Sequence, residues 1–251
     1  MTTPTHPEFL DDSYLRSCKS EVVSINASGG IILDQTVFYA TSGGQPGDSG
    51  WLELNDGSRI EILSSIKDKI SGGIALIPTQ EDAERARILI TPGTNLNCHI
   101  DWHRRYKLMQ MHTACHLLSV VCPLPITSAN VGENESRIDF DMPELLAPKD
   151  ELSSAMMALV DANEPVFNQW IEEAELDANP DLVKSKNVKP PKGVGRIRLV
   201  CIGENSSVDS QPCGGTHVKT TGEIGPIHIG KIEKKGKENR RFRIRFGEMP
   251  N

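Results

Sequence analysis

The sequence contains no long hydrophobic run. Hydrophobic residues make up 37% and charged residues 24% of its 251 residues, which predicts a soluble globular chain with enough material for one large domain or two ordinary ones. No stretch approaches the roughly 20 apolar residues that a membrane-spanning helix needs. Residues 1–6 have neither the basic nor the apolar part of a signal peptide. These absences predict a cytoplasmic protein that does not bind a membrane.

The sequence also lacks a disulfide framework, an internal repeat and a low-complexity tract. Its thiols are expected to stay reduced in the cytoplasm, and most are predicted to be buried. Only one has a partner of chemical interest, the last of the six cysteines Cys18, Cys98, Cys115, Cys122, Cys201 and Cys213.

The net charge of −7 argues at first against a nucleic-acid partner, but the charge is unevenly distributed. Residues 184–245 contain 15 Lys or Arg and 5 Asp or Glu, a net charge of +10, so the rest of the chain carries −17. This asymmetry predicts a local basic surface on an otherwise acidic protein. Lysines that protect an exposed sheet edge would give the same composition, so charge alone does not decide between the two.

Short β-like runs separated by turn residues occupy the chain from about residue 21 to residue 90. Such a succession is typical of a small β-barrel or sandwich, and we predict a first domain over residues 1–95. Its expected strands are 22–25, 30–33, 36–39, 51–54, 60–63, 74–77 and 87–90.

Helical and strand-like patterns are mixed in the second part of the chain. Asp101 is a plausible N-cap for a helix over residues 102–121, which Pro123 ends. A second helical region, interrupted near Pro165, is expected over 150–175. Helices packed on an antiparallel sheet make the predicted fold class α+β, with a second domain over residues 96–251. The expected strands of that domain are 136–141, 196–201, 224–232 and 241–246.

Two motifs with the same spacing predict a metal site. His112-Thr-Ala-Cys-His116 lies in the predicted helix, where residues four apart share a face. Cys213-Gly-Gly-Thr-His217 has the same spacing, but its glycine pair favours a turn. Three imidazoles and one thiolate suit one tetrahedral Zn²⁺ ion. The alternative is that the motifs are incidental, with satisfied helix histidines and a buried thiol.

A glycine-rich segment, residues 41–50, interrupts the predicted barrel. Four glycines and a proline in ten residues allow the backbone to approach a ligand or another domain closely. The segment lacks the Gly-Lys-Ser/Thr ending of a P-loop, so we do not expect it to bind nucleotide phosphates. An ordinary barrel turn is the alternative.

Taken in order, these motifs resemble the editing domain of alanyl-tRNA synthetase and, more closely, the freestanding AlaX-type alanyl-tRNA editing proteins. The resemblance covers roughly residues 20–246. The metal motifs are also shared with threonyl-tRNA synthetase editing domains, whereas the glycine-rich segment is not. The resemblance is carried by Phe38-Tyr39, 42–50, Asp101-Trp102, 112–116, 213–217 and Arg240-Arg241.

The resemblance implies a zinc-dependent deacylase that acts in trans on alanine tRNA carrying serine or glycine, with residues 96–251 as the editing domain. Such a second site is chemically needed, because a pocket for alanine cannot reject glycine by size and excludes serine only weakly. Zn²⁺ would either activate water or position the substrate. Two alternatives stay open: a zinc-stabilised RNA-binding module without catalysis, and a deacylase for mischarged threonine tRNA.

The resemblance also implies substrate contacts. Gly43, Gly44 and Gln45 are expected to face the editing cleft from the first domain, and Arg137 matches a family arginine, although a salt bridge would explain it equally well. Thr113 is a further hydroxyl near the metal. The family often has threonine where this chain has Cys115, so that residue either affects the preference for serine or merely packs in the helix.

The basic residues of the second domain are the predicted tRNA contacts. They would set affinity and its salt dependence more than specificity. Transfer RNA is the expected partner, and no obligate protein partner is evident. The residues are Lys184, Lys186, Lys189, Lys192, Lys231, Lys234, Lys235, Lys237, Arg240 and Arg241.

Overall fold

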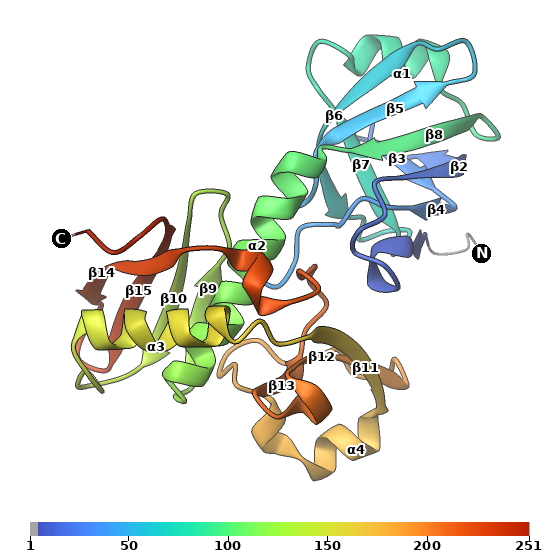
Figure 1. Cartoon of the computed structure of the whole chain (residues 1–251). Coiled ribbons are helices and arrows are strands. Elements are labelled where there is room, and N and C mark those ends of the chain that lie inside the picture. Colours follow the sequence, from blue (N-terminus) through green and yellow to red (C-terminus); the bar gives the residue numbers. More distant parts are fainter. Residues whose placement is uncertain (1–4, 251) are drawn as a thin grey trace. The chain divides into compact units, whose positions relative to one another are not determined.

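The structure, a computed structural model, describes residues 5–250 and divides into two compact units (Figure 1). The first unit runs to residue 42 and resumes from 46 to 106. The second comprises residues 43–45 and the described chain from 107 onward. In the part that the structure describes, no helix is long and apolar enough to cross a membrane.

The first unit is a closed barrel in which every neighbouring pair of strands is antiparallel. Alternate residues point inward, as Ile60 and Ile62 do, because side chains of a strand alternate between its two faces. Leu33, Leu52 and Leu76 fill the same core. In barrel order the strands are β2 (Ser17–Ile25), β3 (Ile31–Leu33), β7 (Ile74–Pro78), β6 (Arg59–Lys67), β5 (Gly50–Leu54) and β8 (Asn95–Ile100).

Two predicted strands of this unit are wrong. Residues 87–90 lie mostly in the helix α1 (Ala83–Leu89), because its Ala-Glu-Arg-Ala-Arg-Ile-Leu sequence consists almost entirely of good helix formers. Of residues 36–39, only Thr36 lies in a strand. It belongs to β4 (Gln35–Thr36), which pairs in parallel with β1 (His6–Pro7) and is preceded in the chain by the 3-10 helix η1 (Glu8–Leu10).

The strand β8, which closes the barrel by pairing with β2 and β5, is not among the predicted strands. Its polar–apolar alternation buries Leu96, Cys98 and Ile100. Residues 96–106, predicted for the second domain, belong to the barrel unit.

A buried ion pair joins the end of the glycine-rich segment to the first turns of α2 (Trp102–Val121). The side chains of Asp48 and Arg105 are 1% and 0% exposed. The Nε atom of Arg105 lies 3.0 and 3.1 Å from the two carboxylate oxygens, and its remaining nitrogens also donate to the carbonyls of Ser13 and Val37. Asp48 accepts a further bond from the Tyr39 amide at 2.6 Å. The pair is thus fully hydrogen-bonded, as burial of charge requires.

The second unit contains a four-stranded antiparallel sheet in the order β14-β15-β10-β9. The helix α3 (Lys149–Asp161) packs on this sheet, and its Ser153 hydroxyl accepts a bond from the Ile229 amide at 3.0 Å. The predicted helix 102–121 is confirmed as α2, and Asp101 caps it by accepting the Arg104 amide at 3.1 Å. The strands are β9 (Ile126–Asn130), β10 (Glu135–Asp141), β14 (Ile227–Lys234) and β15 (Asn239–Phe246).

A second, three-stranded sheet lies in the same unit, in the order β11-β12-β13. The predicted helical region 150–175 is wrong over residues 166–172, which form the edge strand of this sheet. The helix ends at Asp161, and Asn163 adopts the left-handed conformation (φ 51°) that commonly follows a helix. The β-branched and aromatic residues after Pro165 form a strand instead. The remaining elements are β11 (Val166–Glu172), α4 (Glu173–Ala178), η2 (Pro180–Leu182), β12 (Arg196–Ile202), η3 (Glu204–Ser206), β13 (Asp209–Pro212) and η4 (Thr221–Ile224).

The predicted fold class, α+β with an N-terminal barrel, is confirmed. A closed antiparallel barrel is followed in the chain by helices packed on antiparallel sheets.

The buried pair gives a first testable prediction. Replacement Asp48→Ala leaves the Arg105 charge buried and unpaired, and should lower the free energy of unfolding by about 3–5 kcal/mol. The matched control, Glu53→Ala, breaks the exposed Glu53–Arg59 pair and should cost about 0–1 kcal/mol. Urea unfolding followed by tryptophan fluorescence measures both. Equal losses in the two variants would contradict the role given to the buried pair.

Candidate metal centre

The structure brings His112, His116, Cys213 and His217 together. One ligand atom from each lies within 4.8 Å of all the others, and no other group of three or more His, Cys, Asp or Glu among residues 5–250 is gathered in this way. The Sγ atom of Cys213 is 3.6 Å from Nε2 of His112 and 3.4 Å from Nε2 of His217. Ligands of a tetrahedral zinc ion lie about 3.5 Å apart, given its usual bond lengths. The cluster has the dimensions of a metal site.

Two elements present these ligands. The helix α2 places His112 and His116 on one face, with ring centroids 5.4 Å apart. The loop after β13 supplies Cys213 and His217. This loop passes so close to the helix that a Cβ atom at Gly215 would lie 2.2 Å from Cε1 of His112, whereas one at Gly214 would meet no atom within 4 Å.

Gln45 determines which nitrogen of His112 carries a proton. Its amide nitrogen donates to the Thr216 hydroxyl at 2.8 Å, and its Oε1 accepts the Thr216 amide at 3.1 Å. These two bonds fix the orientation of the side-chain amide. Oε1 also lies 2.8 Å from Nδ1 of His112, so that nitrogen must donate and Nε2 is left bare for a metal.

Thr113 acts in the same way on His217. Its hydroxyl donates to the Met109 carbonyl at 2.9 Å and lies 3.1 Å from Nδ1 of His217. Because the hydroxyl proton is used, Nδ1 must carry the hydrogen, and Nε2 faces the cluster without one.

A carboxylate fixes the third imidazole. Asp209, whose side chain is 1% exposed, contacts Nδ1 of His116 at 3.1 Å. The same carboxylate accepts bonds from Gln211 at 2.7 Å and from the Lys184 ammonium at 2.5 Å, and that ammonium also contacts the Ser119 hydroxyl. In metal-binding histidines, the nitrogen that does not bind the metal usually donates its hydrogen to a carboxylate or carbonyl, which fixes the tautomer.

The electrostatics of the cluster favour metal ligation. Burial alone would raise the pKa of Cys213, but the neighbouring imidazoles of His112 and His217 hold it well below its ordinary value. Burial lowers the pKa of His217, and the charge of His112 lowers it further. Burial opposes charge on His116 as well, yet its bonds to Asp209 and Cys213 raise its pKa to about 9. The thiolate and a neutral imidazole, the forms that bind metals, are therefore already present at neutral pH.

The residues predicted for the substrate occupy different settings. Gly43, Gly44 and Gln45 belong to the second unit, where Gly44 accepts the Val131 amide at 2.8 Å and Gln45 holds His112. The Cβ of an alanine at Gly44, where φ is +84°, would lie 2.6 Å from a carbonyl oxygen of β9. The segment therefore docks closely on β9.

Cys115 and Arg137 also lie in the second unit. Cys115 is buried in α2, and burial raises the pKa of its thiol to about 12, so it stays protonated. Arg137 lies on β10, and its buried Nε atom has no hydrogen-bond partner among the described residues.

The predicted tRNA contacts divide into two groups. Some are already paired: Lys184 with Asp209, Lys186 with Asp141 at 2.6 Å, and Arg241 with Asp139 through two bonds of 2.8 Å, while Arg240 donates to the Pro143 carbonyl. Lys231 and Lys237 lie near glutamates. Four of the predicted tRNA contacts are exposed and have no ion pair among residues 5–250. These are Lys189, Lys192, Lys234 and Lys235.

Asp209, Gln211 and Thr216 are not among the predicted site residues. A signal for the first two was present, because Asp209 and Gln211 alternate along a short strand that leads directly to Cys213. Residues two apart on a strand share a face. Their contacts depend on the pairing of that strand, which local sequence does not reveal.

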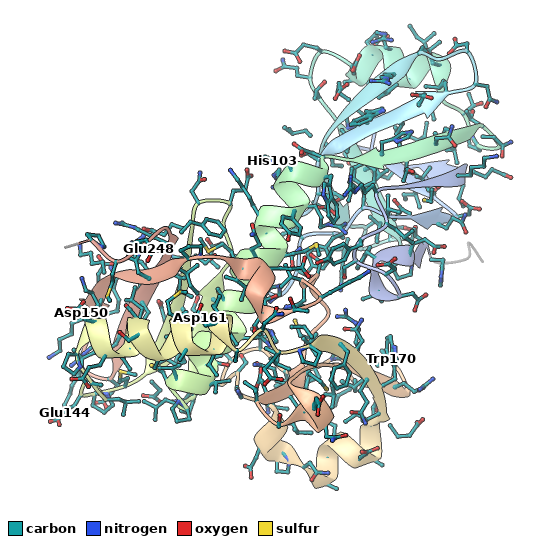
Figure 2. The ribbon with its side chains drawn as sticks, in the orientation of Figure 1. His103, Glu144, Asp150, Asp161, Trp170 and Glu248 are labelled. Atoms are coloured by element: carbon teal, nitrogen blue, oxygen red, sulfur yellow. The ribbon has the colours of Figure 1, made fainter. Side chains whose placement is uncertain are left out.

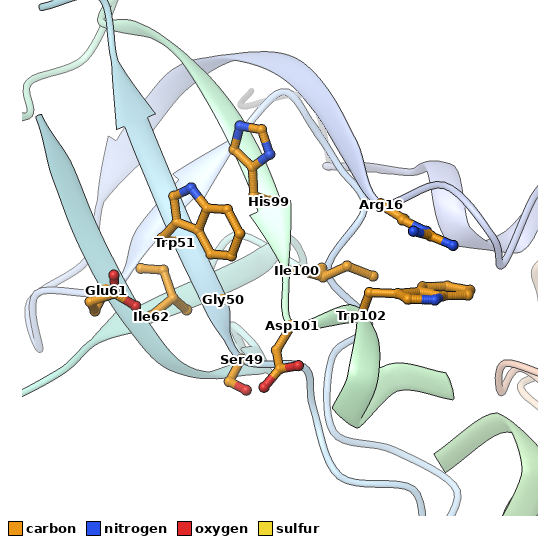
Figure 3. A pocket seen from close by; sticks show the side chains of 10 residues that line it. All are labelled: Arg16, Ser49, Gly50, Trp51, Glu61, Ile62, His99, Ile100, Asp101 and Trp102. Atoms are coloured by element: carbon orange, nitrogen blue, oxygen red, sulfur yellow. The ribbon is translucent and has the colours of Figure 1, made fainter. Parts of the chain in front are cut away.

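A separate cavity of about 520 Å³ lies in the barrel unit (Figure 3). Trp51 stacks on His99 along its wall, with ring centroids 5.0 Å apart, and the Arg16 guanidinium lies over the Trp102 ring. None of the four clustered ligands lines this cavity, so it is not the metal centre.

Comparison with known proteins first defines a class. Residues 197–243 match the family described as the threonyl and alanyl tRNA synthetase second additional domain. Residues 13–104 match class II (A) tRNA synthetases. Both matches fall on domains associated with aminoacyl-tRNA synthetases.

Individual relatives then define the family. The alanyl-tRNA editing protein AlaX-M of Methanosarcina acetivorans is 33% identical over 237 residues, which cover 92% of this chain and 94% of that protein. AlaX-M of Methanosarcina barkeri is 33% identical over 95% of this chain and 97% of that protein. The alanine–tRNA ligase of Pyrobaculum arsenaticum is 34% identical over 92% of this chain but only 25% of that protein. The chain belongs to the AlaX-M family of alanyl-tRNA editing proteins, which confirms the resemblance seen in the sequence.

The close approach at Gly215 can be tested with two neighbouring substitutions. Gly215→Ala should displace His112 and lower metal affinity by more than about 100-fold, beyond the loss typical of an outer partner. Gly214→Ala should leave the affinity unchanged, because its Cβ meets open space. Titration against a chromogenic chelator measures both. Indistinguishable affinities would show that the loop does not press on the ligand.

The carboxylate behind His116 gives a further prediction. Asp209→Ala should lower metal affinity by about 10–100-fold, because His116 loses the partner that fixes its tautomer. Ser210→Ala changes the next residue of β13, whose side chain points to the other face of the sheet, and should have no effect. The same titration against a chromogenic chelator measures the metal affinity of both variants. Unchanged affinity in the Asp209 variant would contradict this positioning role.

Proposed function

We propose that the protein is a metal-dependent deacylase that hydrolyses, in trans, the ester bond of mischarged alanine tRNA. The observation that carries this proposal is the buried cluster of His112, His116, Cys213 and His217, in which all three imidazoles turn Nε2 inward. Relatives that span nearly the whole chain are named alanyl-tRNA editing proteins. One line of support is geometric and the other rests on sequence comparison.

Zn²⁺ is the ion that we assign to the cluster. Three imidazole nitrogens and one thiolate are a preferred zinc donor set, and the thiolate disfavours Mg²⁺ and Ca²⁺, which prefer oxygen. When bound, zinc supplies a positive charge that polarises an oxygen or lowers the pKa of water. Because the chain already offers four ligands, we favour a zinc ion that positions and polarises the substrate.

The surrounding residues hold these ligands in place. Gln45 and Thr216 orient His112, and Asp209 with Lys184 orients His116. The Thr113 hydroxyl is fully used by Met109 and His217, so we assign it to the ligand rather than to the substrate. Fixing ligand geometry in advance lowers the reorganisation that the reaction requires.

Serine is the amino acid that we expect the site to remove first, and glycine second. A synthetase pocket for alanine discriminates poorly against both, whereas a site that hydrogen-bonds a hydroxyl rejects a substrate without it by a large factor. Gly43, Gly44 and Arg137 are the substrate contacts that we propose. The buried, protonated thiol of Cys115 is a weak donor, so its contribution to serine recognition would be small.

The tRNA itself would be held by phosphate contacts. Lys189, Lys192, Lys234 and Lys235 are exposed and carry no ion pair among the described residues, so they are the best candidates. Lys184 is a poorer one, because its charge already neutralises Asp209. We infer that the protein works where mischarged tRNA is found, in the cytoplasm.

A second candidate function is a zinc-stabilised RNA-binding module without catalysis. The observation that favours it is the number of protein ligands, because four are typical of closed structural zinc sites. The third alternative, action on threonine tRNA, is opposed by the glycine-rich segment and Gln45, which threonyl editing domains do not share.

Single-turnover deacylation tests the proposal. Alanine tRNA carrying serine, glycine or alanine is incubated with wild-type protein and with His116→Ala. We expect rapid release of serine, slower release of glycine and little loss of alanine. The variant should lose more than about 100-fold in rate while its circular dichroism is unchanged, because a ligand matters more than its outer partners. If the protein binds the tRNA but leaves the ester bonds intact, the deacylase proposal is wrong and the RNA-binding module without catalysis is supported.

A further inference from the structure

The three-stranded sheet β11-β12-β13 has two different faces. Residues opposite each other in an antiparallel pair point to the same side of a sheet. On one side Ile171, Ile197 and Leu199 form a small apolar core with α4. The other side carries Arg198 on β12 and, on β13, Gln211 together with Asp209.

This second face supports the metal cluster. Arg198 donates to the carbonyls of Cys213 and Gly215 at 2.8 and 2.9 Å, so it holds the loop that carries the ligands Cys213 and His217. Asp209 holds His116 from the same face. A side chain directly opposite Arg198 on the edge strand therefore lies next to the residue that holds the ligand loop.

Trp170 is such a side chain. It lies directly opposite Arg198 in the register of β11 and β12, and β11 is the edge strand. The residue is 39% exposed, and Figure 2 shows it on β11 at the outer edge of this part of the molecule. The Arg196 guanidinium lies 5.9 Å from the ring centroid.

Cations lie near this tryptophan. The side chain of Arg196 is 62% exposed and pairs with the exposed Glu172 at 3.7 Å, so its charge is only partly neutralised. The loop that bears Lys189 and Lys192 ends beside β11, because the amides of residues 194 and 195 bond to Glu173, the residue that follows the strand. An exposed aromatic ring among cations is how proteins hold unpaired nucleotides, with the base stacked on the ring and the phosphates on the cations.

We propose that Trp170 is a stacking platform for an unpaired base of the RNA whose 3′ end lies at the metal cluster, with Arg196 contacting the flanking phosphate. This inference rests on the proposed deacylase function and adds to it the contact that places the ester. Stacking tolerates any base, so the platform serves positioning rather than sequence recognition.

Kinetics of matched aromatic variants test the platform. Trp170→Ala should raise KM for seryl alanine tRNA by about tenfold, the loss expected when one stacked base is released, while Trp170→Phe should restore most of it. The control is Phe167→Ala. Phe167 is equally exposed on the same edge strand, but its side chain points to the opposite face, so KM should not change.

A binding measurement separates this inference from the proposed function. The unacylated single-stranded RNA ACCA should quench tryptophan fluorescence of the wild type, and Trp170→Phe should abolish that quenching. If no ester is cleaved but the quenching depends on Trp170, the stacking platform is supported and the proposed deacylase function is contradicted. A wild-type KM in Trp170→Ala, an equal effect in Phe167→Ala, or quenching that is independent of Trp170 would overturn the platform.

Discussion

The candidate site depends on one constraint, the placement of a hydrogen on Nδ1 of each of three histidines. Gln45 imposes it on His112, Thr113 on His217, and Asp209 supplies the acceptor for His116. In its neutral form each imidazole then presents a bare Nε2 to the thiolate of Cys213, and His116, whose pKa is about 9, must release a proton when a metal binds. A single wrong tautomer would place a proton where the metal must bind, so these hydrogen bonds matter as much as the ligands.

Close backbone approach makes this arrangement possible. Gly215 brings the ligand loop against His112, and Gly44 brings the segment that carries Gln45 against β9. A side chain at either position would meet atoms that cannot move far. On the barrel side of the same segment, Asp48 is fixed by Arg105 through a fully buried pair. The glycine-rich segment is therefore held at both ends by contacts that local sequence does not show.

Local patterns predicted the elements whose signals are local. The helix of His112 and His116 has a capping aspartate, a 3.6-residue apolar repeat and a terminating proline, and the structure gives it the predicted bounds. The apolar run at residues 87–90 predicts a strand but lies mostly in a helix, because so short a run is compatible with both. The role of Asp209 could not be predicted, since it depends on the pairing of β13 with β12 and on the packing of their sheet near His116. The spacing predicted which four residues come together. The partners that orient them lie in the glycine-rich segment, in α2 and in β13.

The most direct test of this account is the coordination of the bound ion. Purified protein loaded with zinc is examined by X-ray absorption and elemental analysis. The account predicts one zinc per chain, bound by three nitrogens at about 2.0–2.1 Å and one sulfur at about 2.3 Å. Less than one ion per chain in zinc-saturated protein, or a shell without sulfur, would contradict the metal centre on which the proposed function rests.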